Sequence, residues 1–589
     1  MEKKDVFKKK GIVLLFFVCL QIGLFAQNIQ VTGSVTESNG SPLPGVNISI
    51  VGTTKGTITS LEGTYSIDVP SNGKLEFKFI GYTSQIIDVN NQSVINIVLE
   101  EDAKALEEVV VVGYGTMKRT DLTGSLVSVS DEAISQTVST SIDQALQGRA
   151  AGVQVMANSG TPGGSSSVRI RGISSLNGSN EPIYVIDGVI IDGSTESGNT
   201  NALSSINPAD IASVDVLKDA SATAIYGSRA ANGVILITTK KGAEGKATIT
   251  YDGYIGWQEM PKKLSLLNLR EYALHKNKRT ELGIVMPDNN FIRADLLGEG
   301  TDWQEELFTK ALMTNHNLSV SGGNENTAYA LGAGYLDQDG IAIGSGFERL
   351  NLRGNFDSKI NNFLKSGISF AFHNSKQKTT VSDESLIRIA LTQTPNVAVR
   401  DAEGSFDGPD TDLYVQSNPV GLAMLKDNSN EKIGIRANTY LEATIIEGMT
   451  FKTDVSLNYG SDNTYKFTPS YTFGALENTQ RIGERSKSYN KFWSVRNILN
   501  YNKVIFDVHS INVMLGQEAQ KSEWEYLYGY RAGYLTNGAT NLSAGDGTTA
   551  KNLGSSGANS LSSFFGRIFY SFDNKYLLTA TLRRDGSSK

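Results

Sequence analysis

The sequence predicts a mostly β protein with three successive parts: a small β-sandwich, a small α+β domain, and part of an antiparallel transmembrane β-barrel. Three observations lead to this prediction. From residue 245 to the end of the 589-residue chain, apolar and polar residues alternate with a period of two. Residues 31–89 contain short alternating runs separated by turn dipeptides. The composition, with 59 Gly, 23 Tyr and 23 Phe, is typical of many strands joined by tight turns.

Charge and hydropathy narrow the class of protein. The formal net charge is −7 and the pI is about 5.4, whereas a nucleic-acid binder needs a basic face. The mean hydropathy of −0.21 is compatible with a membrane barrel, because barrel strands alternate apolar and polar residues. The single cysteine, Cys19, lies in the leading segment, so the rest of the chain has no disulfide and no thiol site.

The first 26 residues have the pattern of a secretory signal peptide. A basic start is followed by an apolar run over residues 11–25 and by Ala26 as the small cleavage residue. A membrane anchor is the alternative, but the run is shorter than the ~20 residues that a spanning helix needs. Residues 16–18 lack the small residue of a lipoprotein cleavage site, so lipid attachment at Cys19 is not expected. The basic residues are Lys3, Lys4, Lys8, Lys9 and Lys10.

Residues 29–100 are expected to form the sandwich. Asn-Gly, Pro-Gly and Glu-Gly turns separate strands whose alternate residues are apolar. The segment contains no Cys or His, which argues against a metal or catalytic site there. It is either a docking or folding module or a spacer without a partner. The predicted inward residues are Val46, Ile48, Ile50, Tyr65, Ile67, Val69, Leu75, Phe77 and Phe79.

A linker at residues 101–119 contains four consecutive valines. These do not alternate with polar residues, and they end in a flexible Gly113-Tyr114-Gly115 pivot. The segment is either a further sandwich strand or an extended strip between two modules, and its position behind an acidic run favours the second. An extended, β-branched strip can add itself as a strand to an exposed sheet edge of a partner.

Residues 120–242 are predicted to form the α+β domain. A buried strand turns at Asp187-Gly188, a short helix over residues 220–226 is stopped by Gly227, and a β-branched strand covers residues 234–239. A helix at residues 141–148 and a strand at 153–155 precede them. The Gly/Ser loop at 160–167 lacks the Gly-Lys-Ser/Thr ending of a P-loop and is expected to be mobile.

Two arginines of this domain, Arg169 and Arg171, precede Gly172 and are predicted to share one face of a strand. On that face they either pair with carboxylates of the barrel wall or are solvated.

From residue 245 onward the alternation predicts barrel strands of ~9–11 residues, apolar or aromatic on one face and small or polar on the other. Examples are residues 249–257, 329–335 and 576–582, and the pair 435–445 and 451–459 joined by a Glu447-Gly448 turn. Long polar loops at 401–418 and 531–557 alternate with short turns. A soluble sandwich is the alternative, but aromatic residues recur near the strand ends. Residues 335–357 resemble a calcium loop only superficially, because Ala342 occupies the required glycine position, so they predict strand, turn and strand.

The predicted strand count is too small for a closed barrel. Large plugged transporters have about 22 strands, and residues 245–589 supply only about half of them at roughly 30 residues per strand. An open half-barrel would leave an unpaired edge in lipid. The sequence is therefore expected to be the N-terminal part of a longer protein.

No catalytic constellation stands out. His275, His316, His373 and His509 lie far apart with no metal-ligand spacing around them. There is no nucleophile elbow, dinucleotide fingerprint or haem motif. An enzyme is not expected, nor any cofactor or metal, and the sequence assigns no substrate-binding residue.

The two blocks at residues 168–191 and 213–242 resemble the plug domain of TonB-dependent outer-membrane receptors, in the form found in the SusC/RagA family. Residues 31–89 are similar to a carboxypeptidase regulatory-like domain, and residues 107–125 resemble the TonB box and the signature that follows it. The box residues implied are Glu108, Val109, Val110, Val111, Val112, Gly113 and Tyr114. The plug signature residues implied are Arg169, Arg171, Gly172, Asp187, Gly188, Tyr226 and Gly227.

The resemblance implies active import of a large nutrient, a glycan or a peptide, across a bacterial outer membrane. TonB, with ExbB, ExbD and the proton-motive force, would pull on the box and open the plug, and a SusD-like surface lipoprotein would assist. The N-terminal domain would lie in the periplasm and the barrel in outer-membrane lipid, with no nucleic-acid partner. The alternatives are a TonB-linked siderophore or vitamin receptor and a surface adhesion protein that transports nothing.

Overall fold

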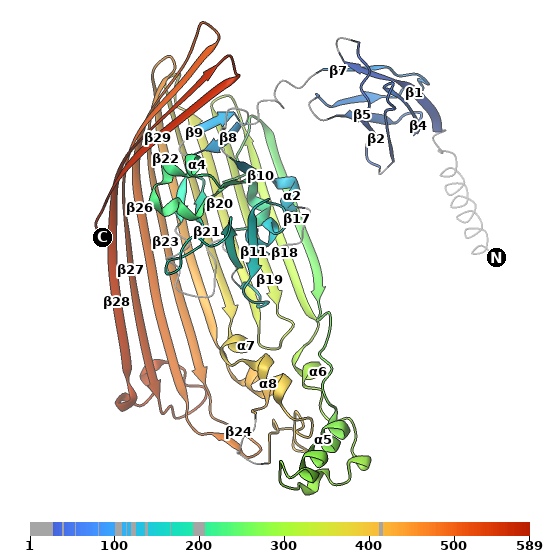
Figure 1. Ribbon diagram of the computed structural model, residues 1–589, viewed down its shortest axis with the longest axis vertical. Helices are drawn as coiled ribbons and strands as arrows, with labels where there is room; N and C mark the ends of the chain where they lie inside the picture. Colours follow the sequence, from blue (N-terminus) through green and yellow to red (C-terminus); the bar gives the residue numbers. More distant parts are fainter. Residues whose placement is uncertain are drawn as a thin grey trace, which may run out of the picture. The chain divides into compact units, whose positions relative to one another are not determined.

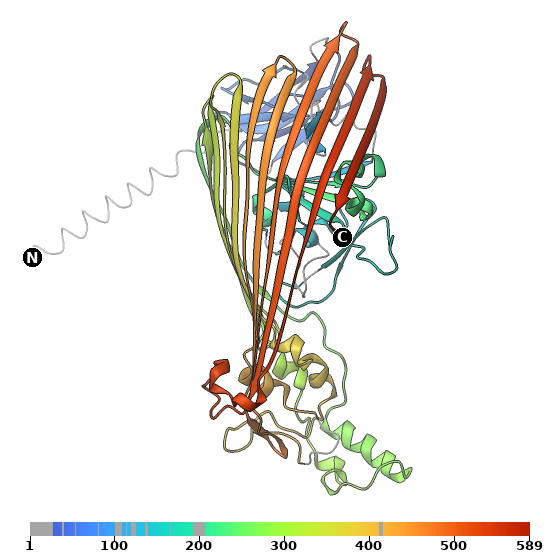
Figure 2. The same cartoon turned by 90° about the vertical axis from the view of Figure 1, so that its left-hand side faces the viewer.

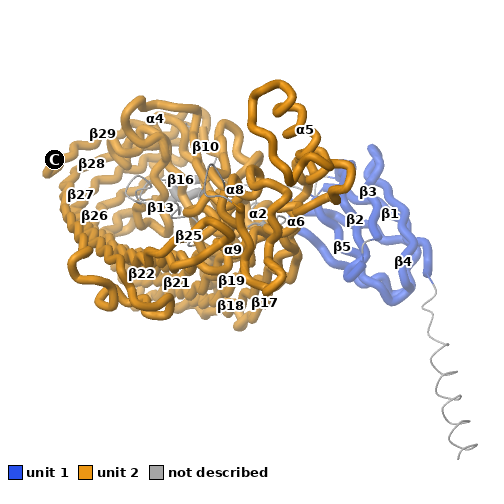
Figure 3. The backbone as a smooth tube through the Cα atoms, turned by 90° about the horizontal axis from the view of Figure 1, so that it is seen from below, with its two compact units in different colours: residues 1–110, 117–120 blue, residues 111–116, 121–589 orange. Residues whose placement is uncertain are grey.

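The structure is a computed structural model that describes residues 28–37, 40–53, 55–79, 82–100, 109–112, 115–118, 125–135, 140–164, 166–191, 206–410 and 416–589. The chain divides into two compact units (Figure 3). One unit comprises residues 1–110 and 117–120, and the other comprises residues 111–116 and 121–589. The expected signal peptide lies outside the described residues.

The first unit contains the predicted β-sandwich. One sheet has the order β4-β1-β7 and the other the order β3-β2-β5-β6. The alternate residues predicted to face inward are buried, except Phe79, which packs against the core while partly exposed. The sandwich prediction is therefore confirmed. The strands are β1 (Asn28–Glu37), β2 (Asn47–Ile50), β3 (Gly56–Ile58), β4 (Thr64–Pro70), β5 (Lys74–Lys78), β6 (Gln85–Asp88) and β7 (Ile97–Leu99).

The second unit begins with the plug, a five-stranded sheet of order β10-β15-β16-β13-β14 with a separate β11-β12 pair. Strands β13 and β16 run parallel, and the other neighbours run antiparallel. The predicted elements are present, although the helix at 220–226 is an α-turn followed by a 3-10 turn. The strands are β10 (Leu126–Ser130), β11 (Val153–Ala157), β12 (Ser166–Ile170), β13 (Ile183–Ile186), β14 (Val189–Ile191), β15 (Ile211–Leu217) and β16 (Val234–Thr239). The helices are α2 (Asp131–Ser135), α3 (Ile142–Leu146), η5 (Pro208–Asp210), α4 (Ala220–Thr223), η6 (Ala224–Tyr226) and η7 (Ser228–Asn232).

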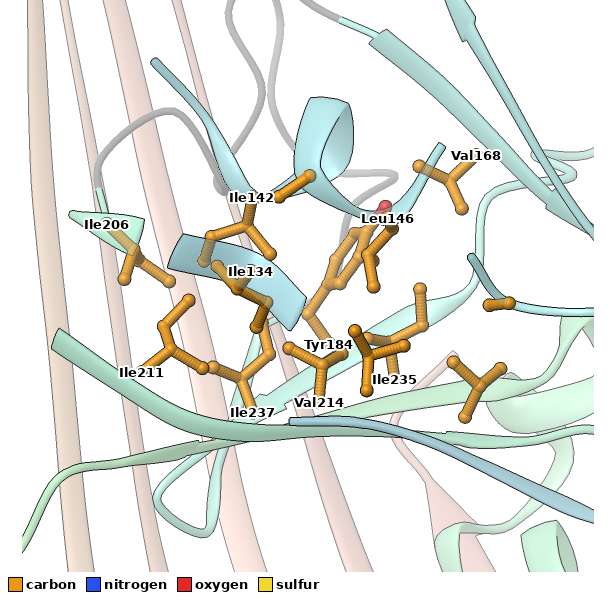
Figure 4. Packing of buried hydrophobic residues seen from close by; sticks show 14 of the residues in the cluster. Ile134, Ile142, Leu146, Val168, Tyr184, Ile206, Ile211, Val214, Ile235 and Ile237 are labelled. Atoms are coloured by element: carbon orange, nitrogen blue, oxygen red, sulfur yellow. The ribbon is translucent and has the colours of Figure 1, made fainter. Parts of the chain in front are cut away.

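The plug sheet buries both of its faces, which explains its nearly continuous apolar strands. On one face, α2 and α3 bring Ile134, Ile142 and Leu146 against Ile211 and Ile235 of the sheet (Figure 4). The opposite face packs on wall residues of the large sheet, namely Ile498, Met514 and Phe565. The plug sheet thus lies between the plug's own helices and the wall.

The wall is an eleven-stranded antiparallel sheet whose strand order follows the sequence. It curves, and the plug lies on its concave side (Figures 1 and 2). Strands β17 and β29 form its two edges. The strands are β17 (Gly245–Gln258), β18 (Ala311–Gly323), β19 (Thr327–Asp339), β20 (Gly346–Lys359), β21 (Leu364–Lys378), β22 (Ser429–Ile446), β23 (Met449–Thr468), β26 (Ile482–Ile505), β27 (His509–Ala532), β28 (Lys551–Phe572) and β29 (Tyr576–Ser587).

The wall strands are longer than predicted, at 12 to 24 residues. At ~3.3 Å per residue, a 24-residue strand extends ~80 Å, far beyond a hydrocarbon core of ~30 Å. The prediction of ~9–11 residues was wrong because the hydrogen-bonded ladders continue well beyond the length that a hydrocarbon core requires. The predicted strand, turn and strand at 335–357 is confirmed by β19 and β20.

The two ends of the wall differ. At one end, turns of two to four residues join neighbouring strands, as at Glu447-Gly448 between β22 and β23. At the other end, long loops carry the helices and the small β24-β25 hairpin (Figure 1). The loop predicted at 531–557 is shorter, because β28 already begins at Lys551. No helix in the described part of the chain is long and apolar enough to cross a bilayer. The loop elements are α5 (Leu269–Glu281), η8 (Asn289–Phe291), η9 (Ala294–Leu296), α6 (Trp303–Leu307), α7 (Thr380–Asp383), α8 (Leu386–Thr392), α9 (Pro419–Leu425), β24 (Tyr471–Phe473), β25 (Leu476–Asn478), η10 (Leu542–Ala544) and η11 (Gly547–Thr549).

Candidate functional site at the plug and its wall

The Asp187-Gly188 turn joins β13 to β14 and touches the wall. Both residues have positive φ, 48° and 85°, as the type I′ turn of a two-residue hairpin requires. The Asp187 carboxylate accepts hydrogen bonds from the backbone N–H and the hydroxyl of Thr239, at 3.0 and 2.8 Å. The carbonyl of Gly188 accepts one from Arg496 of β26, at 3.3 Å. The turn is therefore fixed to the plug sheet on one side and to the wall on the other.

Arg171 lies just beyond the end of β12 in the left-handed region, with φ of 58°, and does not continue the face of Arg169. Its guanidinium pairs with Asp219 of the plug at 2.5 Å. The expectation of a wall carboxylate was thus wrong for Arg171, because its positive φ turns the side chain towards Asp219 of the plug, whereas the side chain stays 53% exposed, as the alternative of solvation predicted. The N–H of Ser125 also donates to Asp219, and these two donors hold the pKa of that carboxyl below its ordinary value.

Tyr226 and Gly227 form the plug's contact with β29. Tyr226 is fully buried in the core shared with the wall. Gly227 has φ of 79°, and a Cβ there would lie 2.6 Å from Oδ2 of Asp585. Beside it, Arg583 of β29 donates to the carbonyl of Ile225 at 2.6 Å. Glycine is required both for the backbone conformation and for the close approach of the wall.

A buried ion network surrounds this contact. Glu518 of β27 has no exposed side-chain surface, and Arg583 lies 3.0 Å from its carboxylate. Arg496 and the plug's Arg229 lie within 3.7 and 3.8 Å. Arg496 also pairs with Asp454 at 2.7 Å. Burying charges is costly unless they are paired. The network therefore holds the plug only while Arg229 of the plug stays beside Glu518 of the wall.

A second polar contact joins the plug to β20. Arg353 forms an ion pair with Asp210 at 2.6 Å and donates to the carbonyl of Lys240 at 2.7 Å. Burial raises the pKa of the Asp210 carboxyl, outweighing the opposing effect of Arg353. On the same strand, Arg349 donates to the carbonyl of Thr140 at 3.0 Å. Wall arginines bonded to plug carbonyls are therefore a recurring feature of the interface.

Between these contacts the plug and the wall leave a cavity of about 310 Å³. It lies between the Asp187-Gly188 turn and strands β20 to β26, and its lining includes Lys241, Lys452 and Asp454. Gly115 also lines it. A polar space of this size can hold several waters.

The linker that follows the sandwich contains a small hairpin. Strand β8 (Val109–Val112) pairs with β9 (Gly115–Lys118) as a separate two-stranded sheet. Of the implied box, Glu108, Gly113 and Tyr114 lie outside the described residues. Gly115 shares the cavity with Thr450 and Asn500, close to the short β22–β23 turn. The sequence predicted the extended conformation, but the partner strand β9 was not foreseen.

Comparison with known proteins agrees with this architecture. Residues 118–234 match the family model of the TonB-dependent receptor plug domain, and residues 31–111 match that of the CarboxypepD_reg-like domain. TonB-dependent receptor P3 of Formosa agariphila is 36% identical over all of this chain and 57% of its own length. TonB-dependent receptor SusC of Bacteroides thetaiotaomicron is 34% identical over all of this chain and 59% of its own length. The chain thus spans little more than half the length of these relatives.

Among solved structures, the RagAB peptide importer in its "open-open" state has a TM-score of 0.71 and 26% identity, covering 82% of this chain and 56% of that one. The ferripyoverdine receptor of the outer membrane of Pseudomonas aeruginosa has a TM-score of 0.50 and 12% identity, covering 87% of this chain and 58% of that one. The second likeness extends to the fold alone, so the siderophore alternative is the weaker one. The relatives are receptors and transporters rather than enzymes. The chain belongs to the SusC-like family of TonB-dependent receptors.

Proposed function

We propose that this chain carries the gate of an outer-membrane importer that takes up a large nutrient, a glycan or a peptide, in a TonB-dependent manner. The observation that carries the proposal is the plug lying on the concave side of the wall, bonded to it through arginines at separate places. A freestanding plug would have argued against a gate. The similarity to the RagAB peptide importer supports the reaction class.

The wall has the surface that outer-membrane lipid requires. On β17, the outward side chains Ile249, Tyr251, Ile255 and Trp257 are 62–73% exposed. Leaving such a face in water would be unfavourable, whereas lipid accommodates it. In barrels of this kind the short turns face the periplasm and the long loops face outward. By that rule the β8-β9 end of the plug faces the periplasm.

The same orientation gives the linker its role. Val109–Val112 would leave β9 and add as a strand to TonB, which ExbB, ExbD and the proton-motive force drive. Hydrogen bonds along the strand would transmit the pull to the plug. A SusD-like lipoprotein would cover the long-loop end, and the N-terminal sandwich would lie in the periplasm. The signature residues Asp187, Gly188, Tyr226 and Gly227 would keep the plug seated until the pull, and Arg171 would stabilise the plug itself through Asp219.

The experiment is uptake of labelled nutrient by cells that carry the full-length protein with altered linkers. Deleting residues 108–115 should abolish uptake and leave binding at the cell surface intact. Val110→Pro should do the same, because proline removes an N–H and disfavours strand addition. Val110→Thr is the matched control, since it keeps a β-branched side chain and should retain uptake. Continued uptake by the deletion variant would show that this segment does not couple energy to the gate.

A further inference from the structure

Strand β27 carries a row of four aromatic side chains on its plug-facing side: Trp524, Tyr526, Tyr528 and Tyr530. Even-numbered residues of this strand face inward, since Met514 packs against the plug and Glu518 is near Arg229. The register with β26 and β28 is unbroken from Glu518 to Tyr530, so the same face continues through the row. We call these four residues the aromatic row.

Along β27, the aromatic row begins just beyond the contact of the plug with this strand. Among the described residues, that contact is the bond from Arg229 to Gln520, at 3.1 Å. One further inward position, Ser522, separates that contact from Trp524. Successive inward residues are ~6.7 Å apart, so the row extends ~20 Å from Trp524 towards the β27–β28 loop.

The outward side of β27 at this height is charged. Lys521 and Glu523 pair at 2.5 Å, and Lys491 of β26 lies 3.9 Å from Glu523. Charged side chains on the lipid face are unfavourable in a membrane, so this part of the wall stands in water. The aromatic row therefore lies on the inner face of the wall, on the long-loop side of the plug's contact with β27, where a solute would arrive.

The indole ring of Trp524 packs on the neighbouring strand and offers a surface for stacking. It lies opposite Gly557 of β28, and a Cβ on that glycine would stand 2.8 Å from the indole nitrogen and 2.9 Å from two further ring atoms. The indole therefore covers the bare backbone of Gly557 while Trp524 remains 43% exposed. A ring resting on one strand has a face available to a ligand.

Most inward positions beside the row are small, neutral and capable of hydrogen bonding; Leu553, opposite Tyr528, adds an apolar one. The two charged groups directly opposite the row already engage it: Tyr528 donates to Glu484 at 2.8 Å, and the Lys551 ammonium lies 4.7 Å from the centre of the Tyr530 ring. The neutral neighbours are Ser486, Ser488 and Asn490 on β26, and Ser555 and Asn559 on β28.

We propose that the aromatic row binds a neutral oligosaccharide chain on the long-loop side of the plug. The apolar C–H face of a sugar ring stacks on an aromatic face, whose electron-rich surface favours such hydrogens. Hydroxyls at the edge of the sugar then reach the flanking serine and asparagine side chains. A peptide of mixed sequence would bring charges, whereas the two charged groups directly beside the row, Glu484 and Lys551, are already engaged by its tyrosines. This inference rests on the proposed import function and narrows its substrate to a glycan.

The test is binding to the full-length receptor in detergent, measured by titration calorimetry and tryptophan fluorescence. The probes are maltoheptaose, cellohexaose, xylohexaose and mannohexaose, with a mixed peptide pool as the competing class. At least one saccharide should bind. Trp524→Ala should weaken that binding at least tenfold, and Gly557→Val should also weaken it severalfold by displacing the indole. Tyr489→Ala, on the outward face of β26, is the matched control and should bind as the unaltered protein does.

The proposal is overturned if none of the saccharides binds, and binding of the peptide pool alone would assign the row to the other class of substrate. It is also overturned if Trp524→Ala and Gly557→Val bind saccharide unchanged. These outcomes are independent of the linker experiment. If Trp524→Ala and Gly557→Val leave saccharide binding unchanged but Val110→Pro abolishes uptake, the protein is still an importer and its solute binds elsewhere.

Discussion

The contact between Arg353 of the wall and Asp210 of the plug offers a direct measure of how firmly the gate is held. Arg353→Ala removes an ion pair of 2.6 Å and a hydrogen bond of 2.7 Å to the carbonyl of Lys240. The side chains of Arg353 and Asp210 are only 9% and 15% exposed, so the aspartate would be left buried without its partner.

Truncating one member of such a buried pair at an interface costs about 2–5 kcal/mol. We take ~3 kcal/mol, because two wall-to-plug contacts disappear, which corresponds to a roughly 100-fold larger population of displaced plug at 1.4 kcal/mol per factor of ten. The raised pKa of Asp210 lets the carboxyl take up a proton, which limits the loss.

Conductance of the full-length receptor in planar bilayers is the assay. The unaltered protein should be closed, and Arg353→Ala should show frequent openings. Asp210→Asn combined with Arg353→Ala should recover part of the closed state, because no uncompensated charge is then buried. If Arg353→Ala stays as closed as the unaltered receptor, or the double variant leaks as much as the single one, this pair does not retain the plug.

Three further predictions concern smaller perturbations. Burial raises the pKa of Tyr65 to about 12, so the folded sandwich holds that proton more tightly than the unfolded chain. Its stability should fall as pH rises above ~10, and melting curves of Tyr65→Phe should lose that dependence. Gly227→Ala should destabilise the plug by about 1–3 kcal/mol, seen as faster proteolysis, because φ is positive and Asp585 leaves no room. The lowered pKa of Asp219 stabilises the plug above the ordinary aspartate pKa and no longer does so as pH falls through the lowered value. Arg171→Ala should therefore move acid-induced loss of plug protection to higher pH, and an unchanged midpoint would contradict the assignment.

Local features could be predicted where local chemistry decides them. The Asp187-Gly188 turn, the stop at Gly227 and the Glu447-Gly448 turn follow from residues that tolerate positive φ. The alternation of Val46 and Ile48 was enough to identify an inward face of the sandwich. These features need only a few neighbouring residues.

The aromatic row shows the limit of that reasoning. Alternation predicted wall strands with an apolar or aromatic face and a small or polar face, but it did not say which face meets the plug. In β27 the aromatic residues face inward. The signal that could have revealed this is the charge of Lys521, Glu523 and Glu525 at the intervening positions.

The sequence alone determined the order of the domains, the strand period and the turns, because steric and hydrophobic preferences act over a few residues. Tertiary structure decided which face of each wall strand meets the plug, which carboxylate Arg171 pairs with, and where the arginines of the wall bond. These depend on pairings between residues as much as 358 positions apart, such as Arg583 and Ile225. Only the folded register of the strands brings such residues together.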